Sequence, residues 1–317
     1  MLDTFLNNSL LQAVAITMVV MVLERLIQLP AAYHPITLMR GFAETVGDKA
    51  VNGKQQSATQ LTISGALAIV VLSMPLVLIV ASILLFAEYT VFFDALLLLF
   101  ALQYSPILEG SKAIQKALEG RKKALARNLL GKWTLRETSA LSEFGICKAI
   151  IESLLLRFSY QYMSVLFWYL VAGGAGAIMY RFIYEISHTW NIKIKAYEQY
   201  GSPASWLCFG LQWIPVRITA LLFVVAVNIG KALSAFKSYQ GKASTHTLLL
   251  TSFGGALDIQ LGGPAYYGKY KIRLPKCGGV RTPELIDIAR ARVAIYQTQG
   301  LFVAMLFLAA AGIYSIG

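Results

Sequence analysis

Uncharged apolar stretches alternate with polar segments along the chain, and their lengths predict the fold. Each stretch approaches the ~20 residues that an α-helix needs to cross a bilayer. Backbone polar groups in lipid must be satisfied within the spanning segment, so helices are the expected form and the fold class is all-α. The first and last stretches are short, which leaves their ends open. The six predicted spans are residues 9–23, 61–81, 90–107, 160–180, 213–230 and 300–316.

Lysine and arginine residues fall almost entirely into alternate gaps between these stretches. Of the 28 basic residues, segments 24–60, 108–159 and 231–299 hold four, ten and ten. The opposite gaps hold three, all in 181–212, and Arg217 lies inside the fifth stretch. Basic loops are retained in the cytoplasm. The pattern therefore predicts a multi-pass protein of the bacterial inner membrane, with long basic cytoplasmic loops and both termini outside.

Composition supports the same class of protein. The chain is 57% hydrophobic and only 14% charged, too apolar for a soluble protein of 317 residues, and one membrane domain over 1–317 is the simplest organisation. The net charge of +12 is explained by the loops, so the predicted partner is the lipid bilayer and not nucleic acid. Segment 1–8 lacks a basic region and a small-residue cleavage site, which predicts a retained anchor instead of a signal peptide. Three widely spaced cysteines without a CxxC motif are predicted to be reduced packing residues: Cys147, Cys208 and Cys277.

Two polar segments carry helix signals. Segment 111–130 places Ile114 and Leu118 near one face and basic residues elsewhere, which predicts a single basic helix. Such a helix lies either against anionic headgroups or in the cytoplasmic solvent. Thr282 and Pro283 have the residue types of an N-cap and a first helical position, so a second helix is predicted to start there and run into the last stretch.

The least ordinary segment is GGALDIQLGGP at 254–264. Paired glycines and a proline at a loop apex let backbone N–H groups approach a ligand closely, especially an anion. The same residue types also suit a tight turn between two helices. Both interpretations stay open on the residues alone.

The run GALDIQLGGPAYY at 255–267 resembles a signature of the CbiB-type membrane proteins of cobalamin biosynthesis, the adenosylcobinamide-phosphate synthases. Other family segments stand in the same order over nearly the whole chain. They are His34-Pro35, Arg136-Glu137-Thr138 in place of Arg-Asp-Thr, Glu152, Leu166-Phe167-Trp168, Tyr180-Arg181, and Pro215-Val216-Arg217 in place of Pro-Ala-Arg. A looser similarity to the AmpE-type proteins linked to β-lactamase regulation is visible in Leu23-Glu24-Arg25-Leu26, Leu166-Phe167-Trp168 and Trp213-Ile214-Pro215-Val216-Arg217.

The resemblance implies a reaction in which an aminopropanol phosphate is joined to a corrinoid carboxylate as an amide. Nucleoside triphosphate and Mg²⁺ are the activating partners that it implies wherever the family activity is retained, and Mg²⁺ takes oxygen ligands and bridges to phosphates. The implied catalytic residues are Glu137, Glu152 and Glu185. The implied ligand-binding residues are His34, Arg136, Arg217, Gly262, Gly263, Pro264 and Tyr267.

Several acids of the family pattern are missing. The Glu-Asn pair downstream of Glu152 reads Leu156-Arg157, the paired aspartates before the Pro-x-Arg segment read Cys208-Phe209, and a Ser-Glu pair ahead of the glycine run reads Leu249-Leu250. Leucine and phenylalanine cannot ligate Mg²⁺, so no metal-ligand set is assigned. The resemblance then predicts a degenerate acidic site with retained binding of a corrinoid or phosphate-bearing ligand. The alternative is a non-catalytic, AmpE-like regulatory protein.

Three points stay open. Small residues at Gly173 and Gly174 either let helices pack closely or break the span, and a break would allow segment 181–212 to lie on either face. Segment 266–273, rich in tyrosine and basic residues, suits phosphate or corrin side chains and suits anionic lipid equally. The oligomeric state is also open.

Overall fold

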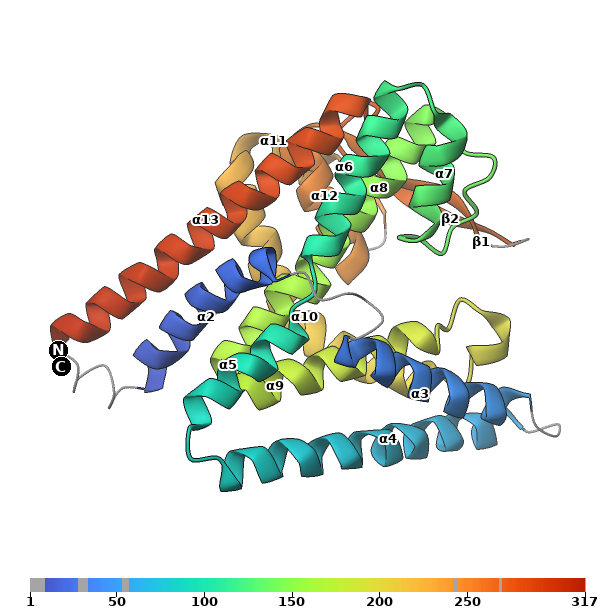
Figure 1. The fold of residues 1–317 in the computed structure, drawn as a ribbon. Coiled ribbons are helices and arrows are strands. Elements are labelled where there is room, and N and C mark those ends of the chain that lie inside the picture. The colour runs from blue at the N-terminus through green and yellow to red at the C-terminus, as the bar shows by residue number, and fades with distance from the viewer. Residues whose placement is uncertain (1–8, 28–33, 53–56, 242–243, 268–269, 317) are drawn as a thin grey trace. The chain divides into compact units, whose positions relative to one another are not determined.

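The computed structural model describes residues 9–27, 34–52, 57–241, 244–267 and 270–316, drawn in colour in Figure 1. Helices dominate these residues, and one β-hairpin precedes the last helix. The first helices are α2 (Ser9–Leu26), α3 (Pro35–Val51), α4 (Ala58–Phe86), α5 (Thr90–Ala101), α6 (Ser105–Glu119) and α7 (Lys123–Gly131). The rest are α8 (Glu143–Arg157), the π-helix η2 (Phe158–Met163), α9 (Ser164–Thr189), the 3₁₀-helix η3 (Lys195–Tyr197), α10 (Ser202–Val227), α11 (Ile229–Ser238), α12 (Thr245–Leu257), β1 (Gln260–Tyr267), β2 (Tyr270–Gly278) and α13 (Leu285–Ile316).

Six helical segments among the described residues are long and apolar enough to cross a bilayer, which confirms the predicted fold class. Each contains or overlaps one predicted span, although four extend well beyond it. They are Ser9–Leu26, Ala58–Phe86, Thr90–Glu119, Glu143–Thr189, Ser202–Val227 and Leu285–Gly312. The sidedness predicted from the basic loops is not part of this confirmation and stays a prediction.

Two helix predictions need correction. The single basic helix predicted over 111–130 is wrong, because α6 ends at Glu119 and Arg121 has a φ of 56°, which a continuous right-handed helix cannot contain. The helix before the last span begins at Leu285, two residues after the predicted start at Pro283. Its continuation into the last apolar stretch is confirmed.

The chain forms two compact units. Unit 1 comprises Met1–Gln103, Ser164–Trp213 and Ile313–Gly317, and unit 2 comprises Tyr104–Met163 and Ile214–Gly312. Compact units within one chain do not by themselves define domains, so the single membrane domain over 1–317 stays a prediction.

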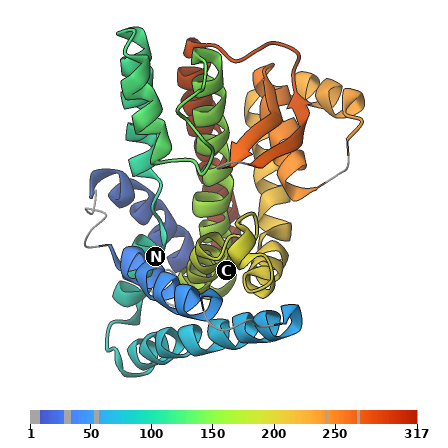
Figure 2. The ribbon, with the colours of Figure 1, turned by 90° about the vertical axis from the view of Figure 1, so that its right-hand side faces the viewer.

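In unit 1, α9 is the element against which the others pack. It contacts α2, α3, α4 and α5, and α3 and α4 lie side by side (Figures 1 and 2). The indole N–H of Trp190, just after α9, donates to the carbonyl of Ala43 in α3 at 2.8 Å. Burial of apolar side chains at this contact stabilises the unit. The core cluster consists of Ala43, Phe182, Ile186, Trp190, Tyr200 and Ala204.

α9 contains a break at the predicted glycines, while the side of the membrane on which segment 181–212 lies stays open. Ala172 and Gly173 leave the helical conformation, and the φ of 65° at Gly173 is readily adopted only by glycine. The interruption frees the Gly174 N–H, which donates to Oδ1 of Asp94 in α5 at 2.7 Å. The Tyr169 hydroxyl donates to the second carboxylate oxygen at 2.8 Å. Sequence reasoning found the glycines but missed Asp94, which caps the second half of the helix.

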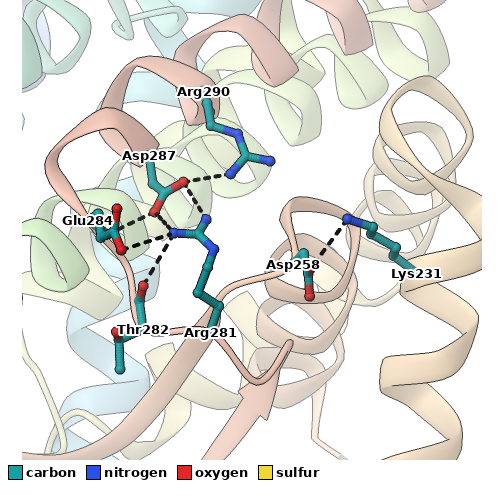
Figure 3. A network of polar contacts seen from close by, with 7 residues as sticks. All are labelled: Lys231, Asp258, Arg281, Thr282, Glu284, Asp287 and Arg290. Carbon is teal, nitrogen blue, oxygen red and sulfur yellow. Dashed lines mark hydrogen bonds and ion pairs between the residues drawn. The ribbon is translucent and has the colours of Figure 1, made fainter.

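In unit 2, the hairpin of β1 and β2 packs against α12, and α12 also contacts α11 (Figures 1 and 2). Ser244 caps α12, with the Thr247 hydroxyl reaching back to its backbone N–H in a capping box. Asp258 ends the helix in the left-handed conformation and pairs with Lys231 at 3.0 Å (Figure 3). This turn directs the chain from α12 into the hairpin.

The start of α13 is held by a charged network around Asp287 (Figure 3). This carboxylate is 1% exposed and accepts from Arg281 at 2.7 Å and from Arg290 at 2.8 Å. It also accepts from the backbone N–H of Glu284 at 2.8 Å. An acid in the first turn of a helix is favoured by the helix dipole, so the network stabilises the N-terminal end of α13.

Candidate functional site

The glycine-rich run does not form the loop predicted for it. Gly254 and Gly255 belong to the last turn of α12, and Gly262, Gly263 and Pro264 belong to strand β1. The prediction of a loop apex is therefore wrong. Glycine and proline are depleted in strands, and for this reason the segment did not suggest a hairpin.

The paired glycines produce an irregularity in the strand. Gly262 and Gly263 have φ values of 73° and 85°, and the pairing register with β2 shifts between Gly262 and Pro264. A Cβ atom on Gly262 would lie 2.1 Å from the carbonyl oxygen of Pro275, so only glycine fits there. The bulge turns the local backbone away from the regular ladder.

The backbone N–H of Gly262 donates to Oε1 of Glu152, in α8, at 2.6 Å. The other carboxylate oxygen, Oε2, lies 2.5 Å from Nη2 of Arg136, whose side chain is 14% exposed. The Glu152 side chain is only 2% exposed. Both of its oxygens are thus already engaged, one by a cation and one by the strand backbone. Three residues predicted from the family resemblance therefore meet in unit 2.

Further cations lie at the same place. Lys148 stands one turn before Glu152 on α8, and its Nζ is 3.2 Å from the position that a Cβ on Gly263 would take. Arg136 and Lys276 are close enough to act electrostatically on Lys148. Three cations against one carboxylate give the site a positive charge, which together with glycine backbone suits an anionic ligand.

Glu137 has a different environment from Glu152. Its backbone N–H donates to the carbonyl of Tyr266 at 2.9 Å, so this segment runs along the hairpin. Its carboxylate is exposed and accepts from the N–H of Ser139 at 3.1 Å. These hydrogen bonds from Ser139 hold the pKa of Glu137 below its ordinary value, so the carboxylate is ionised at neutral pH.

For the other predicted residues of unit 2, the structure gives the position in the fold and, for two of them, the burial. Pro264 is exposed on β1, and Arg217 is partly buried in α10. Tyr267 is the last residue of β1 and pairs with Tyr270, and its side chain lies outside the described residues.

His34 and Glu185 belong to unit 1, so the predicted residues divide between the two units. Oε2 of Glu185 lies 2.7 Å from Nη2 of Arg40, and Oε1 lies 2.8 Å from Nη2 of Arg181. His34 caps α3 by accepting from the N–H of Ile36 at 3.3 Å. Neither arginine partner was among the predicted site residues. Arg181 was quoted only as part of a family segment. The signal that could have identified it is its position four residues before Glu185, which places the two side chains on the same face of one helix.

Burial lowers the pKa of the His34 imidazole to about 4, and the positive charge of Arg181 acts in the same direction while Glu185 opposes it. The folded protein therefore holds His34 neutral at pH 7. The unfolded chain takes up a proton near the ordinary value of 6.5, so protonation favours unfolding as the pH falls from about 6.5 to about 4.

This depressed pKa predicts acid sensitivity. Between about pH 7 and about pH 5, the free energy of unfolding is expected to fall by about 2 kcal/mol through His34 alone. The His34→Asn variant keeps a side chain that can cap α3 and removes the titration. Thermal unfolding of both proteins across this range tests the idea, and an equally steep loss in the variant would assign the acid sensitivity to other groups.

Mg²⁺ does not fit these residues. Among the described residues, no group of three or more His, Cys, Asp or Glu side chains is arranged to hold a metal ion. Glu152 and Glu185 are each paired with arginine, and a carboxylate in such a pair has lost oxygens that a hard cation needs. The three cysteines are buried and form no disulfide, as predicted.

A cavity of about 570 Å³ lies elsewhere in unit 2. It is lined by residues near the N-terminal ends of α8 and α13 and the C-terminal end of α6, among them Phe144, Pro283 and Glu119. None of the predicted site residues lines it.

Together these features define a polytopic helical membrane protein with a charged site on a β-hairpin. The family model described as CobD/Cbib protein matches residues 17–295. A protein of Chromobacterium violaceum named Cobalamin biosynthesis protein CobD is 30% identical over 306 residues, covering 92% of this chain and 95% of the relative. Proteins with the same name from Stutzerimonas stutzeri and Mycobacterium tuberculosis are 26% and 27% identical, over 67% and 61% of this chain and 71% and 64% of their own lengths.

The chain belongs to the CobD/CbiB family of cobalamin biosynthesis membrane proteins. This finding confirms the resemblance inferred from the glycine-rich run and the ordered segments around it. No solved structure matches the chain.

Proposed function

We propose that this protein is related in function to the synthase that joins aminopropanol phosphate to a corrinoid, and that its hairpin site binds a phosphate-bearing or corrinoid ligand. The observation that carries the proposal is the convergence of Arg136, Lys148 and the Gly262-Gly263 backbone on one point of unit 2. Cations and backbone N–H groups are the usual partners of phosphate and carboxylate oxygens, and here the Gly262 N–H is held by Glu152 beside Arg136. The family membership of the chain supports the choice of ligand.

Glu152 has a positioning role in this proposal. Its carboxylate links the Gly262 N–H to Arg136, so it fixes the hairpin backbone beside a ligand-binding guanidinium. Among the three predicted acids, Glu137 keeps an exposed, ionised carboxylate, and it is the proposed catalytic carboxylate of amide formation. Glu185, in unit 1, is proposed to act on its arginine partners and not on the reacting atoms.

The proposal is tested by complementation of a bacterium that lacks its own cobinamide-phosphate synthase and is grown on cobyric acid. Membrane insertion of the expressed protein is verified first. Growth would show that amide formation survives with this set of acids, and the Glu137→Gln variant should then slow growth strongly. The matched control is Glu143→Gln, an exposed acid near the start of α8. Equal growth with both variants would remove Glu137 from the reaction.

A non-catalytic, regulatory function in the manner of the AmpE-type proteins is the second candidate. It is favoured by the pairing of Glu152 and Glu185 with arginines, which leaves neither unit with a carboxylate cluster among the described residues. In that case a well-inserted protein fails to support growth and still binds cobyric acid, measured by quenching of tryptophan fluorescence. Failure of both growth and binding contradicts the proposed ligand as well.

A further inference from the structure

The guanidinium of Arg181 is the least satisfied charged group described in unit 1. Its side chain is 1% exposed. Nη2 donates to Oε1 of Gln103 at 3.4 Å and forms an ion pair with Oε1 of Glu185 at 2.8 Å. Nε and Nη1 are buried and have no hydrogen-bond partner among the residues that the structure describes. These two nitrogens carry most of the N–H donors of the group. Buried donors of a charged group are normally paired, so these N–H groups are suited to bind the oxygen atoms of a ligand.

The charges around Arg181 do not cancel. Glu185 is the carboxylate shared by two guanidinium groups, because Arg40 contacts its other oxygen at 2.7 Å. His34 adds no charge at neutral pH, since burial and Arg181 lower its pKa to about 4. The ring of Tyr184 lies 5.4 Å from the Arg181 guanidinium carbon, a cation–π contact that leaves the N–H edge open. Arg40 and Arg181 therefore exceed Glu185 by one positive charge, with the Glu44 carboxylate acting on Arg40 and His188 acting on Glu185 from outside these three side chains.

We propose that Arg181, flanked by Arg40 and His34, binds a singly charged oxyanion, either the carboxylate of a soluble ligand or the phosphodiester of a lipid headgroup. One negative charge balances the excess of Arg40 and Arg181 over Glu185, and planar guanidinium donors match carboxylate and phosphate oxygens. A charged side chain in a membrane-spanning segment is retained mainly where it faces a partner or a ligand. This site lies in unit 1 and does not depend on amide formation at the hairpin.

Two anionic probes test the proposal on the full chain, purified in a neutral detergent with bound lipid removed. Sodium propionate supplies a soluble carboxylate, and dihexanoyl phosphatidylglycerol supplies a phosphodiester. Dihexanoyl glycerol has the same chains without phosphate and serves as the lipid control. We expect at least one anionic probe, and not dihexanoyl glycerol, to raise the melting temperature by several degrees at saturation.

The Arg181→Gln/Glu185→Gln double variant is the main comparison. It removes the unpaired N–H groups together with their carboxylate, so Arg40 still leaves one net positive charge. We expect affinity for the effective probe to fall at least tenfold. Lys49→Gln, which removes an exposed cation from α3, is the matched control and should bind as the wild type does. Arg181→Lys keeps the charge without the planar donors, and its affinity for the effective probe should also fall at least tenfold. It replaces the double variant in the comparison if the double variant does not fold.

Each outcome has a definite reading. A response to propionate alone assigns the site to a soluble carboxylate, and a response to the phosphatidylglycerol alone assigns it to lipid. No response of the wild type to either anion overturns the proposal and leaves buried water as the acceptor of the N–H groups. An equal response in the wild type and the Arg181 variants also overturns it, because the anion then binds elsewhere.

Discussion

Replacing Glu152 by alanine is expected to lower the free energy of unfolding by about 3–5 kcal/mol. The carboxylate is 2% exposed and holds the Arg136 guanidinium at 2.5 Å and the Gly262 N–H at 2.6 Å. Alanine removes both acceptor oxygens at once, so a largely buried cation loses its carboxylate and a strand N–H loses its acceptor. Denaturation of the purified protein in mixed micelles measures the change.

Two comparisons separate this effect from a general loss of charge. Glu143→Ala removes an exposed carboxylate from the first turn of the same helix, α8, and should cost less than about 1 kcal/mol. The Glu152→Leu/Arg136→Met double variant replaces the pair by apolar side chains and should recover much of the lost stability. A loss in Glu152→Ala no larger than that in Glu143→Ala would show that the carboxylate does not hold the hairpin.

The two adjacent glycines of β1 are expected to respond very differently to substitution. Gly262→Ala should lower the free energy of unfolding by about 3 kcal/mol, through a disfavoured left-handed φ and a clash with a backbone oxygen. The added Cβ would lie 2.1 Å from the carbonyl of Pro275, which cannot move without disrupting the hairpin. Growth on cobyric acid and binding of cobyric acid should both be lost.

Gly263→Val should abolish ligand binding while the protein still inserts, although valine also lowers the stability of the hairpin because the φ of 85° at Gly263 is disfavoured for a β-branched residue. The added Cβ would lie 3.2 Å from Nζ of Lys148, so the lysine side chain can move aside, but its ammonium group is then displaced from the glycine backbone. Gly300→Ala, at a position in α13 with no atom within 4 Å of the added Cβ, is the control and should leave binding unchanged. Full cobyric acid binding by a folded Gly263→Val protein would remove the paired glycines from the site.

Much of the fold could be predicted because the signal is local. A span needs about 20 apolar residues in succession, and that requirement is visible without knowing what the span contacts. The break in α9 was visible as an alternative for the same reason, since Gly173 adopts conformations that other residues avoid. The hairpin was missed because its first strand contains two glycines and a proline, which argue locally against a strand.

The candidate site could be predicted only as a set of residues and not as an arrangement. The family segments correctly pointed to Arg136, Glu152 and the glycine pair, which meet in unit 2. They also suggested that Glu137, Glu152 and Glu185 share acidic chemistry. In the structure Glu137 is exposed, and Glu152 and Glu185 are ion-paired in separate units.

The sequence by itself determined that the chain has membrane-spanning helices, that its fold class is all-α and that it belongs to this family. Hydropathy, charge distribution and ordered motifs can be recognised along the chain without knowledge of its tertiary contacts. Only the tertiary structure decided which charges are satisfied. The Gly262 N–H reaches a carboxylate 110 positions away, and Arg40 reaches one 145 positions away. Pairings over such distances depend on how helices pack, so the engaged oxygens of Glu152 and the unpaired N–H groups of Arg181 became visible only in the folded chain.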